Sequence, residues 1–346
     1  PTLFPPDAWY AHEMLFGYTG AALVGFVMTA VPNWTGRLPV SGGPLLFLVV
    51  LWMTGRLVML WPDLIGMLPS LVLDSMFFPI VGIIVGREIV AGRNWRNLHI
   101  LAALTCLGVA DVWFHWAAAS GNDTGYVYRL MISMWIMLIS IVGGRLNVSF
   151  TRNWLARRGE KRLPKPPGPF DRAVLIISAF PLVLWVLAPG WWGTGVAASI
   201  GAASSLARMV RWRGVATWRE PLVLVLHTAF FFIPIGYLAI GLSAFGMITP
   251  VSALHVLTVG AIANMTMAVM TRTTLGHTGR SPAASRSTTM AYACLALAAL
   301  VRPVVDAFPE HYLFVLEASA FLWLLAYGLF IIEYAPMLFA RRVDRR

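Results

Sequence analysis

The chain has 346 residues, of which 58% are hydrophobic and 12% are charged, and its mean hydropathy is +0.73. A soluble globular domain carries about 25% charged residues, so this composition excludes one and indicates a polytopic helical membrane protein. The formal net charge of +11 does not indicate nucleic-acid binding, because the basic residues fall in alternate loops and do not form a basic face with base-stacking aromatics.

Apolar runs interrupted by proline, glycine and charge clusters predict about eleven membrane spans. The predicted fold is therefore an all-α transmembrane bundle, and residues 1–346 are expected to form a single domain. In chain order the spans are residues 12–31, 44–61, 67–91, 97–119, 124–145, 171–189, 191–210, 221–245, 250–271, 286–304 and 310–339.

The charge distribution predicts the topology of these spans. Basic residues follow every odd-numbered span, whereas the intervening loops contain no Lys or Arg. By the positive-inside rule, the C-terminus is cytoplasmic and the segment before the first span lies outside. An odd number of spans with an outside start predicts a further helix before residue 1. The basic, proline-rich segment 151–170 is expected to be a cytoplasmic loop that lies against anionic lipid.

Ionisable side chains concentrate in the predicted outer half of the bilayer. Because charges are costly there, they normally face one another, a cavity or a ligand. Asp111 and His115 are spaced i, i+4 and share a helix face. Their contact fits either a carboxylate that orients a ligating imidazole or an internal hydrogen bond that holds a buried histidine neutral. The set is His12, Glu13, Arg56, Asp74, Asp111, His115, Arg129, His255 and Glu317, with Arg302, Asp306 and His311 in or near the loop before the last span.

A sparser set lies toward the predicted inner side. His227 is expected two turns or so into its span, among apolar neighbours, and His277 follows the span that contains His255. His99 is interpreted as an interfacial, solvated side chain. The methionines of these spans suit soft Cu(I), but they are more often core filler.

The sequence contains no phosphate-binding loop, dinucleotide fingerprint, GxSxG elbow or HExxH motif. Imidazole, carboxylate and guanidinium groups remain. Imidazole is the usual axial ligand of haem iron, and arginines at the same depth can hold haem propionates. The residues therefore favour a noncovalent haem b site in the outer half. A transporter that uses the same side chains as a proton or substrate path is the competing interpretation, followed by a metal-free scaffold.

Four segments resemble the NnrS family: AHEMLFGY (11–18), TAVPNWTGRLP (29–39), GGR (143–145) and LHVLTVGAIANMTMAVMTRTTLGHTGR (254–280). The resemblance implies a bacterial inner-membrane protein of about twelve spans that contains haem and copper and acts in the response to nitric oxide. By position, the family's characteristic histidines fall on His12, His227, His255 and His277.

Together these observations predict haem b bound through His12 and His255, with Arg56 and Arg129 as propionate partners. Copper is expected at a second set, His227 and His277, and His115 is a further metal ligand. Glu13, Asp111 and Glu317 are expected to support the ligands. The expected partners are the lipid bilayer and nitric oxide or another small gaseous or redox ligand. The residues leave open whether the protein is an oxidoreductase, a sensor or an assembly factor.

Overall fold

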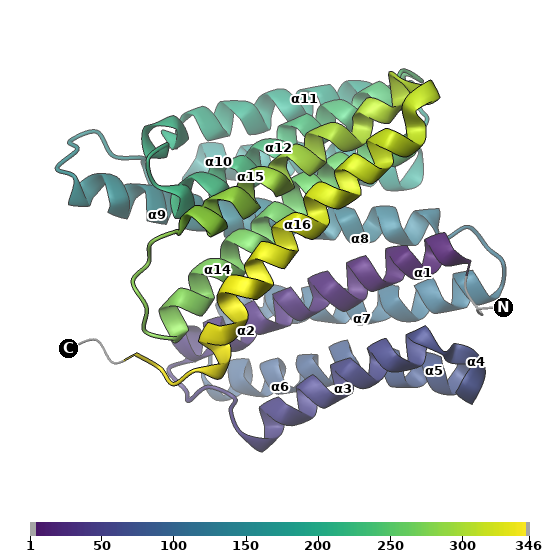
Figure 1. Ribbon diagram of the computed structural model, residues 1–346, viewed down its shortest axis with the longest axis horizontal. Coiled ribbons are helices and arrows are strands. Elements are labelled where there is room, and N and C mark those ends of the chain that lie inside the picture. Colours follow the sequence, from purple (N-terminus) through teal and green to yellow (C-terminus); the bar gives the residue numbers. More distant parts are fainter. Residues whose placement is uncertain (1–4, 344–346) are drawn as a thin grey trace. The chain divides into compact units, whose positions relative to one another are not determined.

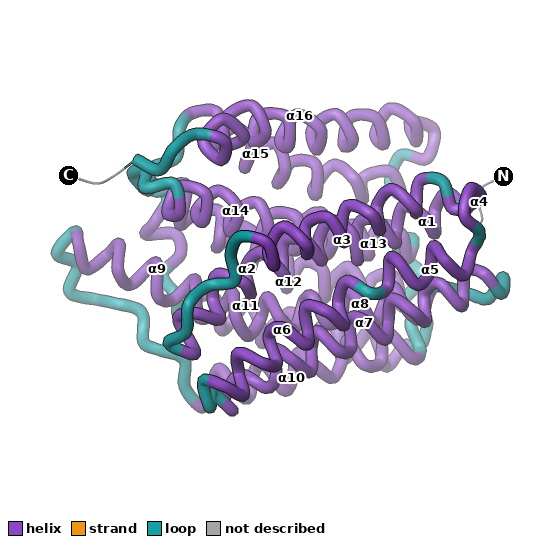
Figure 2. The backbone as a smooth tube through the Cα atoms, turned by 90° about the horizontal axis from the view of Figure 1, so that it is seen from below, coloured by secondary structure: helices purple, strands orange, loops and turns teal. Residues whose placement is uncertain are grey.

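The computed structural model describes residues 5–343, except for the side chain at position 63. Every regular element among these residues is helical, and no strand occurs in them (Figure 2). This confirms the predicted all-α class. Ten helices are long and apolar enough to cross a membrane, which confirms a multi-pass membrane protein. The predicted span 191–210 is also a helix, but it is not among these ten, because glycine, serine, threonine and Arg208 lower its hydropathy.

The chain forms two compact units. Unit 1 comprises residues 1–131 and unit 2 residues 132–346. The boundary lies inside helix α8 (Gly125–Leu138). The single domain expected from the sequence remains a prediction.

Unit 1 is built mainly from four long helical segments. The first is continuous and contains α1 (Pro6–His12), the π-helix η1 (Glu13–Tyr18) and α2 (Thr19–Thr35). Helix α6 packs on α7 and α2, while α5 packs on α3 and α7 (Figure 1). The remaining elements are α3 (Gly43–Leu60), α4 (Pro62–Ile65), α5 (Met67–Ser75), α6 (Phe77–Ala91), the 3-10 turn η2 (Trp95–Asn97) and α7 (Leu98–Ala119).

The core of unit 1 is aromatic. Phe16, Phe78 and Phe114 are fully buried, and the Phe16 ring packs edge-on against the other two at centroid distances of 6.4 and 5.8 Å. A Cβ atom at Gly20 would lie 2.8 Å from the Phe78 ring, so the missing side chain there allows α2 to approach α6 closely.

Unit 2 is organised around α12 (Pro221–Ala244), which contacts α9 (Gly144–Arg157), α11 (Trp192–Val210) and most of the elements that follow it. Helices α15 (Arg286–Val301) and α16 (Tyr312–Phe339) lie side by side (Figure 1). The other elements are the π-helix η3 (Ile139–Gly143), α10 (Pro169–Leu187), η4 (Gly214–Thr217), α13 (Pro250–His255), the π-helix η5 (Val256–Ala263), α14 (Asn264–His277), η6 (Arg302–Asp306) and η7 (Pro309–His311).

The predicted loop 151–170 begins later than expected. Helix α9 continues to Arg157, and α10 starts at Pro169, so irregular structure covers only the residues between them. Pro169 occupies the first turn of α10, where its fixed φ favours helix initiation. Next to this turn, the buried Arg208 donates to Asp171 at 3.0 Å and to the Ser140 carbonyl at 2.9 Å, which links α11 to α10 and η3.

Candidate metal centre

Four side chains that can ligate a metal converge inside unit 1. One ligand atom from each of them lies within 4.8 Å of the others, and no other group of three or more such side chains comes together among the described residues. All four are buried, with exposed fractions of 0 to 3%. This group, called the unit 1 centre below, comprises His12, Asp74, Asp111 and His115.

Three separate elements supply these side chains. His12 is the last residue of α1, and Asp74 lies near the end of α5. Asp111 and His115 are one turn apart on α7, as their spacing predicted. Because the ligands come from α1, α5 and α7, the packing of unit 1 creates the centre, and no single segment contains it.

The distances within the centre match those between ligands of one metal ion. His12 Nε2 lies 2.9 Å from Asp111 Oδ1 and 3.0 Å from Asp74 Oδ2. His115 Nε2 lies 2.9 Å from Asp74 Oδ2 and 3.8 Å from Asp111 Oδ1. With metal–ligand bonds of about 2.1 Å, ligands lie about 3.0 Å apart at right angles and about 3.4 Å apart in a tetrahedron. The same nitrogen–oxygen distances also fit hydrogen bonds, so the centre accommodates either a metal ion or protons.

The charge around the centre adds a second constraint. Arg56 forms ion pairs with Glu13, at 2.7 Å, and with Asp74. Glu13 Oε1 also lies 3.2 Å from His12 Nδ1. The three carboxylates of this network and one guanidinium leave two negative charges among buried groups. Buried charge requires compensation, which either one divalent cation or two imidazolium protons would supply.

Aromatic rings close the centre on one side. The His12 ring stacks on Phe16 at 5.1 Å between centroids and lies 5.5 Å from Phe114. The imidazoles of His12 and His115 lie 4.8 Å apart. Such apolar surroundings exclude water and strengthen electrostatic interactions among the polar groups.

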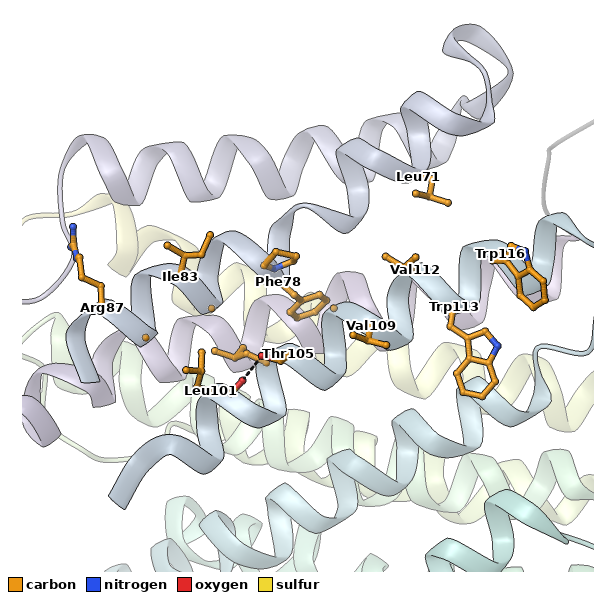
Figure 3. Close-up of a pocket in the computed structure, with 15 residues that line it drawn as sticks. Leu71, Phe78, Ile83, Arg87, Leu101, Thr105, Val109, Val112, Trp113 and Trp116 are labelled. Atoms are coloured by element: carbon orange, nitrogen blue, oxygen red, sulfur yellow. Dashed lines mark hydrogen bonds between the residues drawn. The ribbon is translucent and has the colours of Figure 1, made fainter. Parts of the chain in front are cut away.

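A groove on unit 1 lies away from this centre. It has a volume of about 990 Å³ and lies over α6 and α7, with Arg87 toward one end and Trp113 and Trp116 toward the other (Figure 3). Its lining contains no histidine or carboxylate. In a membrane helix such an apolar surface faces hydrocarbon, so the groove itself is not a metal site.

In unit 2, one ring nitrogen of His255 is hydrogen-bonded, and the other is available to bind a metal ion. Its Nδ1 lies 2.7 Å from the Val251 carbonyl, which accepts the Nδ1 proton. Nε2 makes no hydrogen bond to any described residue. A hydrogen bond from one ring nitrogen to a backbone carbonyl fixes the tautomer and leaves the lone pair of the other available to a metal.

A model of the family described as NnrS protein matches residues 1–342. The chain belongs to the NnrS family. The comparisons with curated proteins and with solved structures gave no match.

The resemblance to the NnrS family implies haem and copper. The residues present fit these two groups to different degrees. His255 fits an axial haem ligand, because its Nε2 is free to bind. The unit 1 centre contains two imidazoles and two carboxylates, and this donor set suits Cu(II), Fe(II) or another divalent ion better than Cu(I). Neither His227 nor His277 belongs to a group of three or more metal-ligating side chains among the described residues.

The other predicted site residues of this NnrS protein are dispersed. Arg129 lies against the rings of Tyr126 and Tyr128, at 5.0 and 5.6 Å. His227 is buried, with Nε2 2.7 Å from Thr151 Oγ1, whereas His277 and Glu317 are exposed. The predicted pairing of His12 with His255 at one haem joins residues of separate units and stays a prediction.

Asp74 is the site residue that the sequence did not single out. It was one of several ionisable groups in the predicted outer half, and its spacing gave no pattern with another ligand. The contacts that reveal it, from Asp74 Oδ2 to His12 Nε2 and to His115 Nε2, join segments distant in sequence.

Proposed function

We propose that this protein is a membrane metalloprotein that acts in the response to nitric oxide, by binding it, by redox chemistry or by removing it. The proposal assigns a divalent ion, copper or iron, to the unit 1 centre and haem b to His255. The observation that carries it is the convergence of four buried ligand atoms within 4.8 Å. Family membership supports the connection to nitric oxide. We further propose that the protein lies in the bacterial inner membrane with a cytoplasmic C-terminus, which the charge pattern supports.

In this proposal each residue of the network has a distinct task. His12 and His115 would ligate the metal ion through Nε2, and Asp74 and Asp111 would each ligate it through one carboxylate oxygen. Arg56 holds Asp74 in place and balances part of its charge, and Glu13 orients His12 through Nδ1. A bound copper or iron ion would supply one-electron redox chemistry at a site that the aromatic rings shield from water.

Metal analysis of the purified protein tests the assignment. We expect close to one equivalent of a transition metal per chain, in addition to haem iron, and loss of most of it in His115→Ala, because one of four ligands is removed. His99→Ala is the matched control: this histidine is on the same helix, is exposed and bonds only the Arg96 carbonyl. Equal metal content in the wild type and His115→Ala would refute the site.

A proton-coupled transporter is the second candidate, and one observation favours it. Glu13, Arg56, Asp74 and the two histidines form a continuous chain of polar contacts through the interior of unit 1. Such chains of ionisable groups mark proton paths in transporters. A wild-type protein that contains neither metal nor haem after expression with both in excess would favour the transporter.

A further inference from the structure

A pocket in unit 2 contains a buried positive charge. It has a volume of about 520 Å³ and lies where the loop before α13 meets η6 and the start of α16. The charge pattern assigns this end of unit 2 to the outside of the membrane. The polar side chains that line it are Thr249, Ser252, Arg302, Asp306 and Tyr312.

Arg302 is the buried charge. Its exposed fraction is 9%, and it makes no hydrogen bond or ion pair with any described residue. None of its nitrogen atoms is among the fully buried polar atoms that lack a partner, so the five N–H donors of its guanidinium are accessible from the pocket. A guanidinium confined in a pocket without a protein acceptor is paired with an anion or with ordered water.

The acidic groups around Arg302 do not provide that pairing. Asp306 is the nearest along the chain, but its oxygens accept hydrogen bonds from the backbone N–H of Thr249 at 2.8 Å and from the Thr249 hydroxyl at 3.0 Å. Glu310 and Glu317 are exposed and form no ion pair with Arg302. The other titratable neighbour is His255 of α13, with which Arg302 interacts electrostatically.

We infer that Arg302 is the anchor of an anion site that takes a carboxylate or a similar oxyanion. The planar fork of the guanidinium matches two oxygens of such a group. The hydroxyl of Tyr312, a half-exposed side chain, supplies a further donor at the same pocket. A volume of about 520 Å³ is within the range of ligand pockets.

Two sources can provide this carboxylate. One is a propionate of haem b bound through His255, which makes Arg302 the propionate partner in place of Arg56, whose guanidinium is already paired with Glu13 and Asp74. This arm rests on the haem assignment of the proposed function. The other source is a free anion from the outer aqueous side, which requires no haem.

Reconstitution with haem and with its dimethyl ester tests the first source. Both are titrated into haem-depleted protein and followed by the Soret band, so the readout is affinity. If a propionate binds Arg302, the wild type should prefer haem over the ester by about 10- to 100-fold, the loss expected for a charged hydrogen-bonded contact. The preference should disappear in Arg302→Leu and remain in part in Arg302→Lys. Arg211→Leu, which removes an exposed arginine stacked on Phe170, should leave it unchanged.

Titration with inorganic phosphate and acetate tests the second source, by calorimetry on the His255→Ala protein. Saturable binding that is lost in Arg302→Leu would assign a free anion to the pocket. Failure of the wild type to bind haem would refute the haem assignment alone, and this titration would then decide the anion site.

The inference is wrong if haem and its ester bind equally in the wild type and neither anion binds the His255→Ala protein. Water would then be the only partner of Arg302. If Arg302→Leu does not fold, Arg302→Gln, which keeps amide donors but removes the charge, replaces it in both titrations.

Discussion

Two glycines create the space in which the charges around His12 meet. At Gly55 of α3, a Cβ would lie 2.7 Å from Asp74 Oδ1 and 3.4 Å from Asp74 Cα. At Gly17 of η1, it would collide with the Arg56 guanidinium and lie 3.2 Å from Glu13 Oε2. Neither glycine has an unusual φ, so close approach, and not backbone freedom, explains them. A single methyl group at either position tests how closely the network must fit.

Gly55→Ala should displace the Asp74 carboxylate and weaken metal binding by about 10- to 100-fold, the usual effect of disturbing a group that positions a ligand. Competition with a chelator of known affinity measures the change. Gly25→Ala on α2 is the control, since a Cβ there meets nothing within 4 Å. Unchanged metal affinity in Gly55→Ala would show that Asp74 is not held by this contact.

At the scale of elements, the two histidines that the sequence selected as haem ligands each precede a π-helix. His12 is followed by η1 and His255 by η5. A π-turn inserts an extra residue and changes the direction of the side chains that follow, and such turns are frequent at functional sites. At the start of α14, the Asn264 side chain donates to the Val259 carbonyl at 3.0 Å, five residues back, and so adds a side-chain donor to a backbone acceptor of η5.

Asn264→Ala should remove this side-chain hydrogen bond and destabilise unit 2 by about 0.5–1.5 kcal/mol. The shift appears in the unfolding midpoint of the detergent-solubilised protein, and a π-turn that relaxes should also change the absorption of haem bound at His255. Asn33→Ala provides the comparison, because its amide bonds the Thr29 carbonyl at an exposed position. Equal midpoints in the two variants would contradict a structural role for Asn264.

The sequence predicted the elements well and the site only in part. Long apolar runs determine helices that cross a membrane, so ten of the spans could be assigned without coordinates. The i, i+4 spacing of Asp111 and His115 correctly placed them on one face. The π-helices could not be foreseen, since no residue pattern separates Glu13–Tyr18 from ordinary helix. Asp74 acquires its significance only from its contacts with His12 and His115, and Arg302 only from the pocket that it lines together with the loop before α13.

At the scale of the whole molecule, the best-supported ligands lie in different units. The centre with His12 belongs to unit 1, whereas His255 and the Arg302 pocket belong to unit 2. The sequence favoured one haem held by both histidines. The surroundings of His12 fit a divalent ion, whereas those of His255 fit haem. The expected behaviour of single variants differs between these hypotheses.

With two cofactors, His255→Ala should lose haem and keep the non-haem metal, and His12→Ala should lose the metal and keep haem. With one shared haem, both variants should show the same change in the Soret band. Paired metal analysis and absorption spectra of the two proteins separate the outcomes. Loss of haem in both would restore the pairing of His12 with His255.

The two negative charges that remain unbalanced around His12 affect how the unit 1 centre takes up and releases a metal ion. If protons balance these charges in the absence of metal, uptake of one divalent ion must release two protons. Apparent metal affinity should then rise by about 100-fold for each pH unit in the range where both protons are bound. Calorimetric titrations in buffers of different ionisation enthalpy would count the protons released. The centre would thus load metal most readily from an alkaline compartment and lose it upon acidification.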